Sequence, residues 1–156
     1  MQVHSLVLIV TARDRFEQTR RYVIELGNVQ ALISEGGDDW KPEDVHGGGI
    51  SDPTASRACY NVDVWGERLE QLRERECELI DFIGTTLAII EAVRRGLGDD
   101  YADILDQRYI DGLRWCDVLV DGEPVTLSTG KRKAAIAFDW VDSIGLTGVL
   151  KGDYEL

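Results

Sequence analysis

A heptad-like run of apolar residues between about residues 53 and 95 constrains this chain more than any other feature. Glu76 and Thr86 interrupt the run, and charged residues fill the positions between. The pattern predicts a coiled-coil-like helix, roughly 60 Å long at ~1.5 Å per residue. Ser51-Asp52-Pro53 predicts its start, because a capping side chain followed by proline suits a first helical turn. The apolar positions are Ala58, Val62, Trp65, Leu69, Leu72, Leu79, Ile83, Ile90 and Val93.

A shorter amphipathic stretch precedes this helix and supplies a packing partner for it. Thr11 and Asp14 predict its start, through a capping hydroxyl and an acid in the first turn. Gly36-Gly37 predict its end, and residues 36 to 52 are expected to form the loop that reverses the chain. The apolar face consists of Phe16, Val23, Leu26 and Ile33, widened by Tyr22, Val29 and Leu32. Residues 1–96 are therefore expected to form a long helical hairpin.

Residues 97–156 are expected to form a compact cluster of short helices. Gly96 to Asp99 breaks the chain, and a helix then carries Tyr101, Ile104, Leu105 and Tyr109 on one side and stops at Gly112. A short helix is expected at 114–119, a turn at 120–124 and a last helix at about 129–144. That last helix has an apolar stripe of Ile136, Ala137, Trp140, Val141 and Ile144. The predicted fold is all-α, with a hairpin arm followed by a helix-turn-helix domain.

The charge of the chain limits its partners. The net charge is −12, with 29 Asp and Glu against 17 Lys and Arg. Such a deficit argues against a surface that wraps nucleic acid or lies on an anionic membrane, but permits one local basic patch. The apolar run Ser5–Val10 is too short to span a bilayer. We therefore expect a protein without a membrane segment or leader.

The cysteines and glycines do not point to catalysis or to a metal. Cys59, Cys77 and Cys116 have the wrong spacing for a disulfide framework or a zinc site, are expected to pack as small hydrophobes, and suit a reducing cytoplasm. His46-Gly47-Gly48-Gly49 matches the oxyanion-hole pattern of lipases, but the G-x-S-x-G nucleophile motif is absent. We expect a loop there, and no enzyme, cofactor or metal.

The start of the last helix is the candidate DNA-binding site. A short helix, a turn and a second amphipathic helix are the layout of a helix-turn-helix. Hydroxyl groups and the N–H groups of a helix N-terminus can bind phosphate oxygens. A run of basic residues favours DNA binding because it neutralises phosphates and releases their counterions. The candidate residues are Ser128, Thr129, Lys131, Arg132 and Lys133, with Arg114 upstream. Arg132 is expected to face outward, opposite Ile136 and Trp140. A plain solvated helix start fits the same residues.

Two motifs resemble a known family. "ILDQRYIDGLRW" is similar to the RYI-G-x-W segment of phage transcriptional regulators of the ArpU/RinA type, whose last portion resembles sigma factor region four. "GGGISDPTA" leading into a long helix fits the layout of the same family. The resemblance implies core roles for Tyr109 and Trp115 and a recognition helix that begins at Ser128, Thr129 and Lys131–Lys133. The acidic turn at 121–125 departs from the family, as do Asp139 and Asp142 on the outer face.

These features lead to one expected function and two alternatives. The expected function is a phage or prophage transcriptional regulator that binds double-stranded DNA through its C-terminal helix-turn-helix. The regulator is expected to be a homodimer whose two copies meet through the long helix. Eight acids between Asp99 and Glu123, against Arg108 and Arg114, predict weak and salt-dependent binding by one copy. One alternative is an acidic inhibitor that binds RNA polymerase or another host nucleic-acid-binding protein. A less favoured alternative is a small DNA-packaging subunit.

Overall fold

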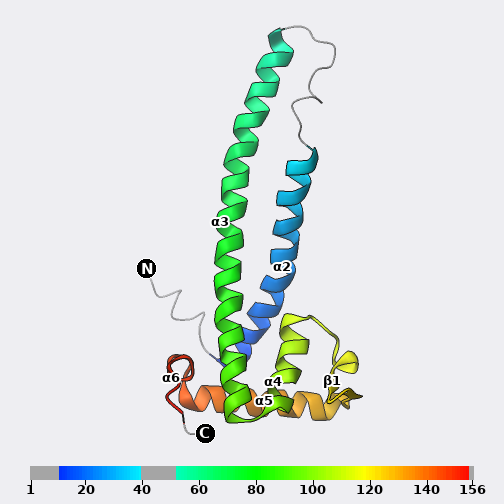
Figure 1. The fold of residues 1–156 in the computed structure, drawn as a ribbon, viewed down its shortest axis with the longest axis vertical. Coiled ribbons are helices and arrows are strands. Elements are labelled where there is room, and N and C mark those ends of the chain that lie inside the picture. Colours follow the sequence, from blue (N-terminus) through cyan, green and yellow to red (C-terminus); the bar gives the residue numbers. More distant parts are fainter. Residues whose placement is uncertain (1–10, 40–51, 155–156) are drawn as a thin grey trace. The chain divides into compact units, whose positions relative to one another are not determined.

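The computed structural model describes residues 11–39 and 52–154, with side chains at 11–35 and 64–154. The elements in chain order are α2 (Ala12–Asp39), α3 (Asp52–Gly96), α4 (Asp99–Leu105), a π-helix η2 (Asp106–Ile110), a 3₁₀ turn η3 (Trp115–Asp117), β1 (Leu119–Val120), β2 (Glu123–Pro124), α5 (Leu127–Ile144) and α6 (Leu146–Lys151) (Figure 1). The predicted all-α class is confirmed, with one small hairpin of two strands. The expected loop at His46–Gly49 and the Ser51 cap lie outside the described residues.

The two long helices largely follow the sequence pattern. The Oγ1 atom of Thr11 accepts a hydrogen bond of 3.1 Å from the Asp14 amide, so the predicted cap is confirmed. Helix α3 runs as one element from Asp52 to Gly96, close to the predicted bounds. Helix α2 continues to Asp39, beyond the predicted stop at Gly36-Gly37. Glycine is permitted inside a helix at a cost of about 1 kcal/mol, so it ends a helix only in a suitable context.

The chain divides into two compact units, and α2 and α3 contribute residues to both. One unit contains Ile24–Ile80, and the other contains the segments up to Val23 and from Asp81 onward. The second unit thus joins the first turns of α2 and the last turns of α3 to the C-terminal elements. This grouping differs from the predicted division at residue 96, because Phe16 and Val93 belong to the same core as Tyr109.

In the unit Ile24–Ile80, the first interruption of the heptad pattern is a polar contact between helices. The Glu76 carboxylate accepts a hydrogen bond of 3.3 Å from the side-chain Nε2 of Gln30. Next to it, the Arg75 guanidinium binds both carboxylate oxygens of Glu25, at 2.6 and 2.9 Å. Val29 and Leu79 are buried in this unit. Polar residues at these positions therefore pair α2 with α3 rather than end the helix.

The second interruption, Thr86, is also a polar contact, within the other unit. The Thr86 and Thr19 hydroxyls are both buried and lie 2.8 Å apart. The Arg15 Nε donates to the Thr86 hydroxyl at 3.1 Å, and its Nη2 donates to the Phe82 carbonyl at 2.8 Å. Burial lowers the pKa of Arg15. Because an unpaired buried polar group is costly, this layer favours the register in which all its members find partners.

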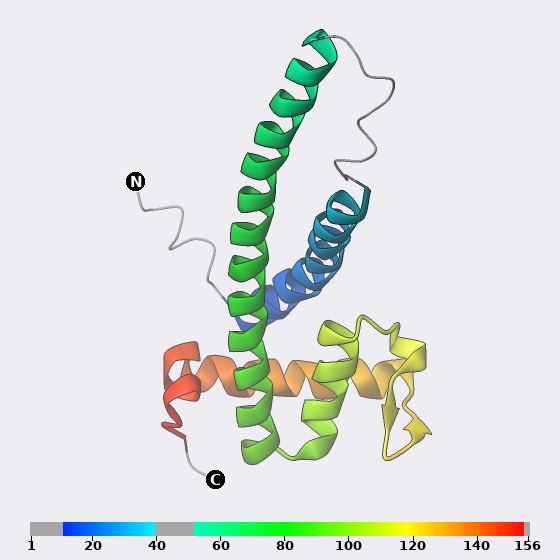
Figure 2. The ribbon, with the colours of Figure 1, turned by 45° about the horizontal axis from the view of Figure 1, so that its top comes forward.

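The hydrophobic core of this unit lies where α5 crosses the ends of α2, α3 and α4 (Figure 2). The Phe16 ring lies 5.5 Å from the Tyr109 ring and 5.3 Å from the Phe138 ring, centroid to centroid. All three side chains are at most 2% exposed. The other fully buried members include Ile89, Ile90, Val93, Ile104, Leu105, Val118, Val141 and Val149. The predicted core residues Ile104, Leu105 and Tyr109 are confirmed.

The predicted apolar stripe of α5 is partly wrong. Ile136 is 41% exposed, whereas Phe138, which the prediction left out of the stripe, is buried. The core-facing side consists of Gly130, Ala134, Ala137, Phe138 and Val141. Two overlapping stripes in this helix are apolar enough to be buried. The space between Phe16 and Tyr109 selects the one that contains Phe138.

The connection before α5 also differs from its prediction. Only Trp115–Asp117 is helical, as a 3₁₀ turn, and the expected turn at 120–124 is part of a hairpin in which Val120 pairs with Glu123. Asp121 and Gly122 both have positive φ, 55° and 80°, as a two-residue type I′ turn requires. The Asp-Gly pair is the local signal for such a turn, and strands of two residues are too short to show a periodicity. Helix α6 was not predicted.

Two further expectations are settled by the described residues. Cys77 and Cys116 are exposed, so these two do not pack as small hydrophobes; the side chain of Cys59 lies outside the described residues. A membrane crossing would need a longer apolar run than any helix offers in the part of the chain that the structure describes.

Two glycines of α3 are expected to respond to alanine in opposite ways. Gly84 is exposed, and an added Cβ would meet nothing within 4 Å, so Gly84→Ala should stabilise the protein by about 0.5–1 kcal/mol. At Gly96 the added Cβ would collide with the Trp140 ring, so Gly96→Ala should lower the unfolding free energy. Thermal denaturation of both variants checks this. Equal shifts in one direction would contradict the packing of Trp140 on Gly96.

Candidate nucleic-acid interface

The first turn of α5 presents free backbone donors. Thr126 caps it, since its side chain accepts a hydrogen bond of 3.3 Å from the Thr129 amide, and the Gly130 amide donates to the Thr126 carbonyl at 2.9 Å. The amides of Leu127 and Ser128 have no acceptor in the helix, as expected for first-turn positions. Both residues are exposed. The positive end of the helix dipole and these N–H groups favour an anion here.

An aromatic side chain positions this helix start. A Cβ at Gly130 would lie 3.2 Å from the Trp115 ring, so glycine permits the close approach of η3 to α5. Trp115 in turn packs edge-on against Tyr109, with ring centroids 6.4 Å apart. The tryptophan and tyrosine that the family resemblance placed in a core are therefore adjacent, with Tyr109 buried and Trp115 half-buried.

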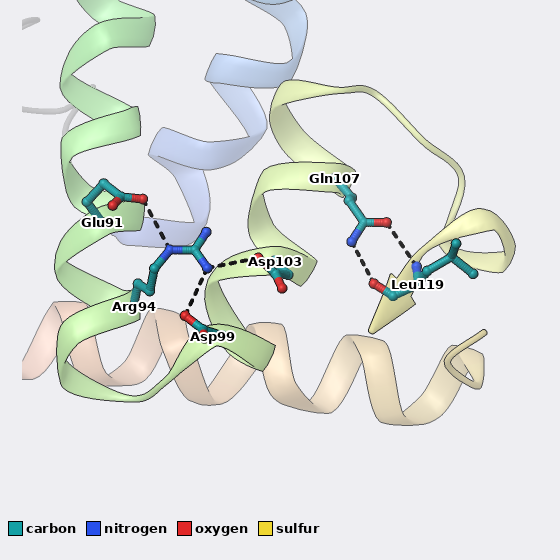
Figure 3. Close-up of polar contacts among 6 residues, drawn as sticks. All are labelled: Glu91, Arg94, Asp99, Asp103, Gln107 and Leu119. Carbon is teal, nitrogen blue, oxygen red and sulfur yellow. Dashed lines mark hydrogen bonds and ion pairs between the residues drawn. The ribbon is translucent and has the colours of Figure 1, made fainter. Parts of the chain in front are cut away.

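A glutamine holds the hairpin in place beside η2. Gln107 donates to the Leu119 carbonyl at 2.6 Å and accepts from the Leu119 amide at 2.9 Å (Figure 3). The Val125 amide donates to the Val118 carbonyl at 3.2 Å, which returns the chain to α5. The connection between η2 and α5 spans residues 111–126, far longer than the three or four residues of a standard helix-turn-helix. These hydrogen bonds hold the long connection in place, whereas a standard helix-turn-helix needs only a short turn.

An arginine fixes α4 on the end of α3. The Arg94 guanidinium binds Glu91 at 3.2 Å, Asp99 at 3.0 Å and Asp103 at 2.9 Å (Figure 3). These hydrogen bonds, those of Asp99 and Asp103 first, raise the pKa of Arg94. Three of the acids near the candidate interface are thus occupied by one cation, which lessens their repulsion of an approaching phosphate.

The structure separates the predicted site residues into two groups. Ser128, Lys131 and Arg132 are exposed, and no described residue forms an ion pair with either cation. Thr129 is half-buried. Lys133 is occupied, because its Nζ lies 3.5 Å from an Asp100 oxygen and 5.4 Å from the Tyr101 ring centroid.

Arg114 is occupied as well. Its Nε lies 3.0 Å from Asp117, and this hydrogen bond raises the pKa of the fully exposed guanidinium. Since solvent screens exposed ion pairs of this kind and leaves them weak, Arg114 can exchange its partner for another anion. The two unpaired cations of the predicted set are therefore Lys131 and Arg132.

The outward face of α5 carries mixed chemistry. Arg132, Ile136 and Asp139 are all exposed, and their spacing of four and three residues places them on one face. The expected outward position of Arg132 is confirmed, but Ile136 lies beside it and not opposite. Lys131 lies seven residues before Phe138, two helical turns away, and so occupies the flank on which Phe138 meets α2.

Sequence reasoning missed several arginines near this flank. The Arg13 guanidinium lies 5.1 Å from the centroid of the Phe138 ring, and the Arg108 guanidinium lies 4.9 Å from that of Trp115. Arg20 is two turns after Arg13 on the same side of α2. The spacing of Arg13, Phe16 and Arg20, in steps of three and four, is a signal that could have shown them to share a face.

The arrangement offers anion contacts at the start of α5 in a chain of net charge −12. Exposed cations, free amides and hydroxyls surround the start of α5, and the hairpin and Trp115 hold that start in position. Comparison with protein-family models, with curated proteins and with solved structures finds no match.

Asp106 provides a test of the acidic surroundings of η2. Burial, then the nearby Asp111, raises the pKa of Asp106, against a lowering by Arg94. A raised folded-state pKa means that the ionised group opposes folding above that pKa and that this penalty fades as the pH falls. Asp106→Asn should therefore raise the melting temperature slightly at pH 7, and this advantage should disappear near pH 3, where the native carboxyl is protonated.

Asp81→Asn is the matched control, because Asp81 is an exposed acid of α3. It should change the melting temperature little and show no such pH dependence. A stabilisation of the Asp106 variant that persisted unchanged at low pH would contradict the electrostatic explanation.

Proposed function

We propose that the protein is a DNA-binding regulator that contacts duplex DNA through the first turns of α5. One observation carries the proposal: Lys131 and Arg132 are exposed and form no ion pair with a described residue. They follow the backbone amides of Leu127 and Ser128, which have no acceptor within the helix. Half or more of protein–DNA hydrogen bonds go to phosphate and sugar, and helix N-termini and basic side chains supply them. The ordered hairpin supports the proposal, since its hydrogen bonds with Gln107 hold this helix start in position.

The outward face of α5 suits the major groove of DNA. A major groove admits one α-helix, arginine pairs with guanine, and an apolar side chain can touch the methyl group of thymine. Arg132 and Ile136 fit these two roles, and Lys131 on the flank fits a phosphate. Asp139 on the same face would repel phosphates and limits the contact to the N-terminal half of the helix. The proposed binding is therefore weak for one copy.

The regulatory role rests on the sequence motifs. The resemblance of "ILDQRYIDGLRW" and "GGGISDPTA" to phage regulators of the ArpU/RinA type supports a role in transcription, with RNA polymerase as the proposed protein partner. The proposed location is the cytoplasm, because the spacing of the three cysteines suits a reducing compartment.

Dimerisation is part of the proposal, because two copies would double the basic contacts. In the unit Ile24–Ile80, Ile24 is 61% exposed, Ile80 47% and Val64 44%, so both long helices carry apolar side chains that a second copy could cover. Sedimentation should give a dimer. A ring of eight or more copies would instead favour the DNA-packaging alternative.

Removing the unpaired cations should weaken DNA binding in a salt-dependent way. For a duplex of about 30 base pairs, Lys131→Ala should make the plot of log association constant against log salt concentration less steep. The magnitude of the slope should fall by about 0.9, the value of one phosphate contact. Arg132→Ala should weaken binding about tenfold and reduce discrimination between sequences, the effect of losing one base contact. Fluorescence anisotropy between 50 and 200 mM salt, about the range in which such slopes are resolved, measures both.

Arg73→Ala is the matched control, since Arg73 is an exposed cation of α3 outside the interface. It removes the same charge and should leave slope and affinity unchanged. Lys133 is omitted from the test because its contacts with Asp100 and Tyr101 give it a structural role. If the variants of Lys131 and Arg132 bound DNA like the Arg73 variant, the proposed interface would be wrong.

The acidic surface favours a second candidate function, inhibition of a nucleic-acid-binding protein. Asp99, Asp111, Asp117, Asp121 and Glu123 are exposed around α4 and the hairpin. Carboxylates in such an array can occupy sites where an enzyme expects phosphates. A stoichiometric complex with a purified host polymerase or nuclease, and no shift of duplex DNA, would favour this function over the first.

A further inference from the structure

An aromatic cluster beside α5 carries arginines on its rim. Tyr109 lies in its centre, with ring centroids 5.5 Å from Phe16, 5.7 Å from Phe138 and 6.4 Å from Trp115. The cluster joins residues of α2, η2, η3 and α5, all within one compact unit. The aromatic rings pack in the hydrophobic core, and arginine side chains lie at the edge of the cluster.

Two arginines stack on this cluster from different elements. Arg13 of α2 lies over the Phe138 ring at 5.1 Å, and Arg108 of η2 lies over the Trp115 ring at 4.9 Å. Stacking fixes the plane of a guanidinium and leaves its N–H groups pointing sideways, where they can bind an acceptor. The two cations are thus oriented before any ligand arrives.

Two buried arginine donors near this cluster lack acceptors among the described residues. The Nε atoms of Arg20 and Arg108 are buried, and neither has a hydrogen-bond partner among the described residues. Within the described part of the chain, Arg108 donates from Nη1 alone, to the Leu113 carbonyl at 3.1 Å. Arg13 and Arg20 form no ion pair with any acid at 11–35 or 64–154. This holds even for Glu17, which lies on the same helix four residues after Arg13 and three before Arg20. Buried donors without a partner are rare in native proteins, and each calls for an explanation such as an absent ion.

Arg13 and Arg108 approach Tyr109 from two elements, since the Phe138 and Trp115 rings on which they stack lie 5.7 and 6.4 Å from the Tyr109 ring, and Arg20 follows Arg13 on the same side of α2. Burial raises the pKa of the Tyr109 phenol, Glu17 raises it further, and Arg108, Arg13 and Arg20 lower it. Three cations and one carboxylate therefore act on one hydroxyl group, a local excess of positive charge in a chain of net charge −12. No described group accepts from or donates to this hydroxyl, which leaves it available as a further donor.

We infer that Arg13, Arg20 and Arg108, with the hydroxyl of Tyr109, form a binding site for a phosphate group. The planar guanidinium matches a phosphate in geometry and in charge, and several arginines together supply the donors that its oxygens require. The backbone of duplex DNA is the source that the surroundings favour, since Lys131 occupies the same flank of α5 as Phe138. That assignment rests on the proposed DNA-binding function, whereas the phosphate site itself does not.

The first arm of the test uses inorganic phosphate alone and the unmodified protein. In ¹⁵N NMR spectra of the arginine side chains, phosphate at constant ionic strength should shift the Nε–Hε signals of Arg13, Arg20 and Arg108. The expected dissociation constant is on the order of 1 mM. Arg21 is the internal control, because it is exposed on α2 and its partner among the described residues is Gln18, at 3.2 Å. Equal shifts at Arg21, or equal shifts with chloride, would overturn the site.

The second arm identifies the source of the phosphate. Arg20→Ala should weaken binding of a duplex of about 20 base pairs at least fivefold and lower its salt slope by about 0.9, whereas Arg21→Ala should do neither. Arg20→Lys should recover part of the slope, which a merely structural loss would not allow. Phosphate shifts without any duplex binding would keep the site, assign it to free phosphate and reject the proposed function. Duplex binding by the unmodified protein without phosphate shifts would reject the site alone.

Discussion

The packing of Phe16 against Tyr109 and Phe138 is the interaction on which the rest of this structure depends. It joins the first turns of α2 to η2 and α5, segments about ninety to one hundred and twenty residues apart in the chain. Aromatic pairs in edge-on geometry contribute about 0.5–1.5 kcal/mol beyond the area that they bury. Because Tyr109 also contacts Trp115, the same cluster places the start of α5 and the arginines on its rim.

Polar residues inside the long helix serve pairing and not termination. Thr86 meets Thr19 and Arg15 in one unit, and Glu76 meets Gln30 in the other. A helix pair with apolar residues at every contact position could slide by a turn at little cost. A buried layer with a single set of satisfied hydrogen bonds disfavours such slipped registers, as a buried asparagine does in coiled coils.

Ion pairs determine which cations of this acidic chain remain available. Arg94 is occupied by three acids, Lys133 by Asp100 and Arg114 by Asp117. Around the first turns of α5 and the Tyr109 cluster, the cations without an ion pair among the described residues include Lys131, Arg132, Arg13, Arg20 and Arg108. A net negative charge is compatible with a local anion site, because pairs at a few ångströms dominate over distant charges that salt screens within about 10 Å.

The sequence by itself determined the long helices, the Thr11 cap and the core residues of the helix at 99–110, because helical periodicity and capping are local properties. It also pointed to Lys131 and Arg132 as exposed cations. The buried face of α5 was decided only by tertiary structure, since Ile136 and Phe138 are equally apolar and the space beside Phe16 admits one of them. The pairing of Lys133 was decided in the same way, because its partner Asp100 lies 33 residues away and no local pattern connects the two.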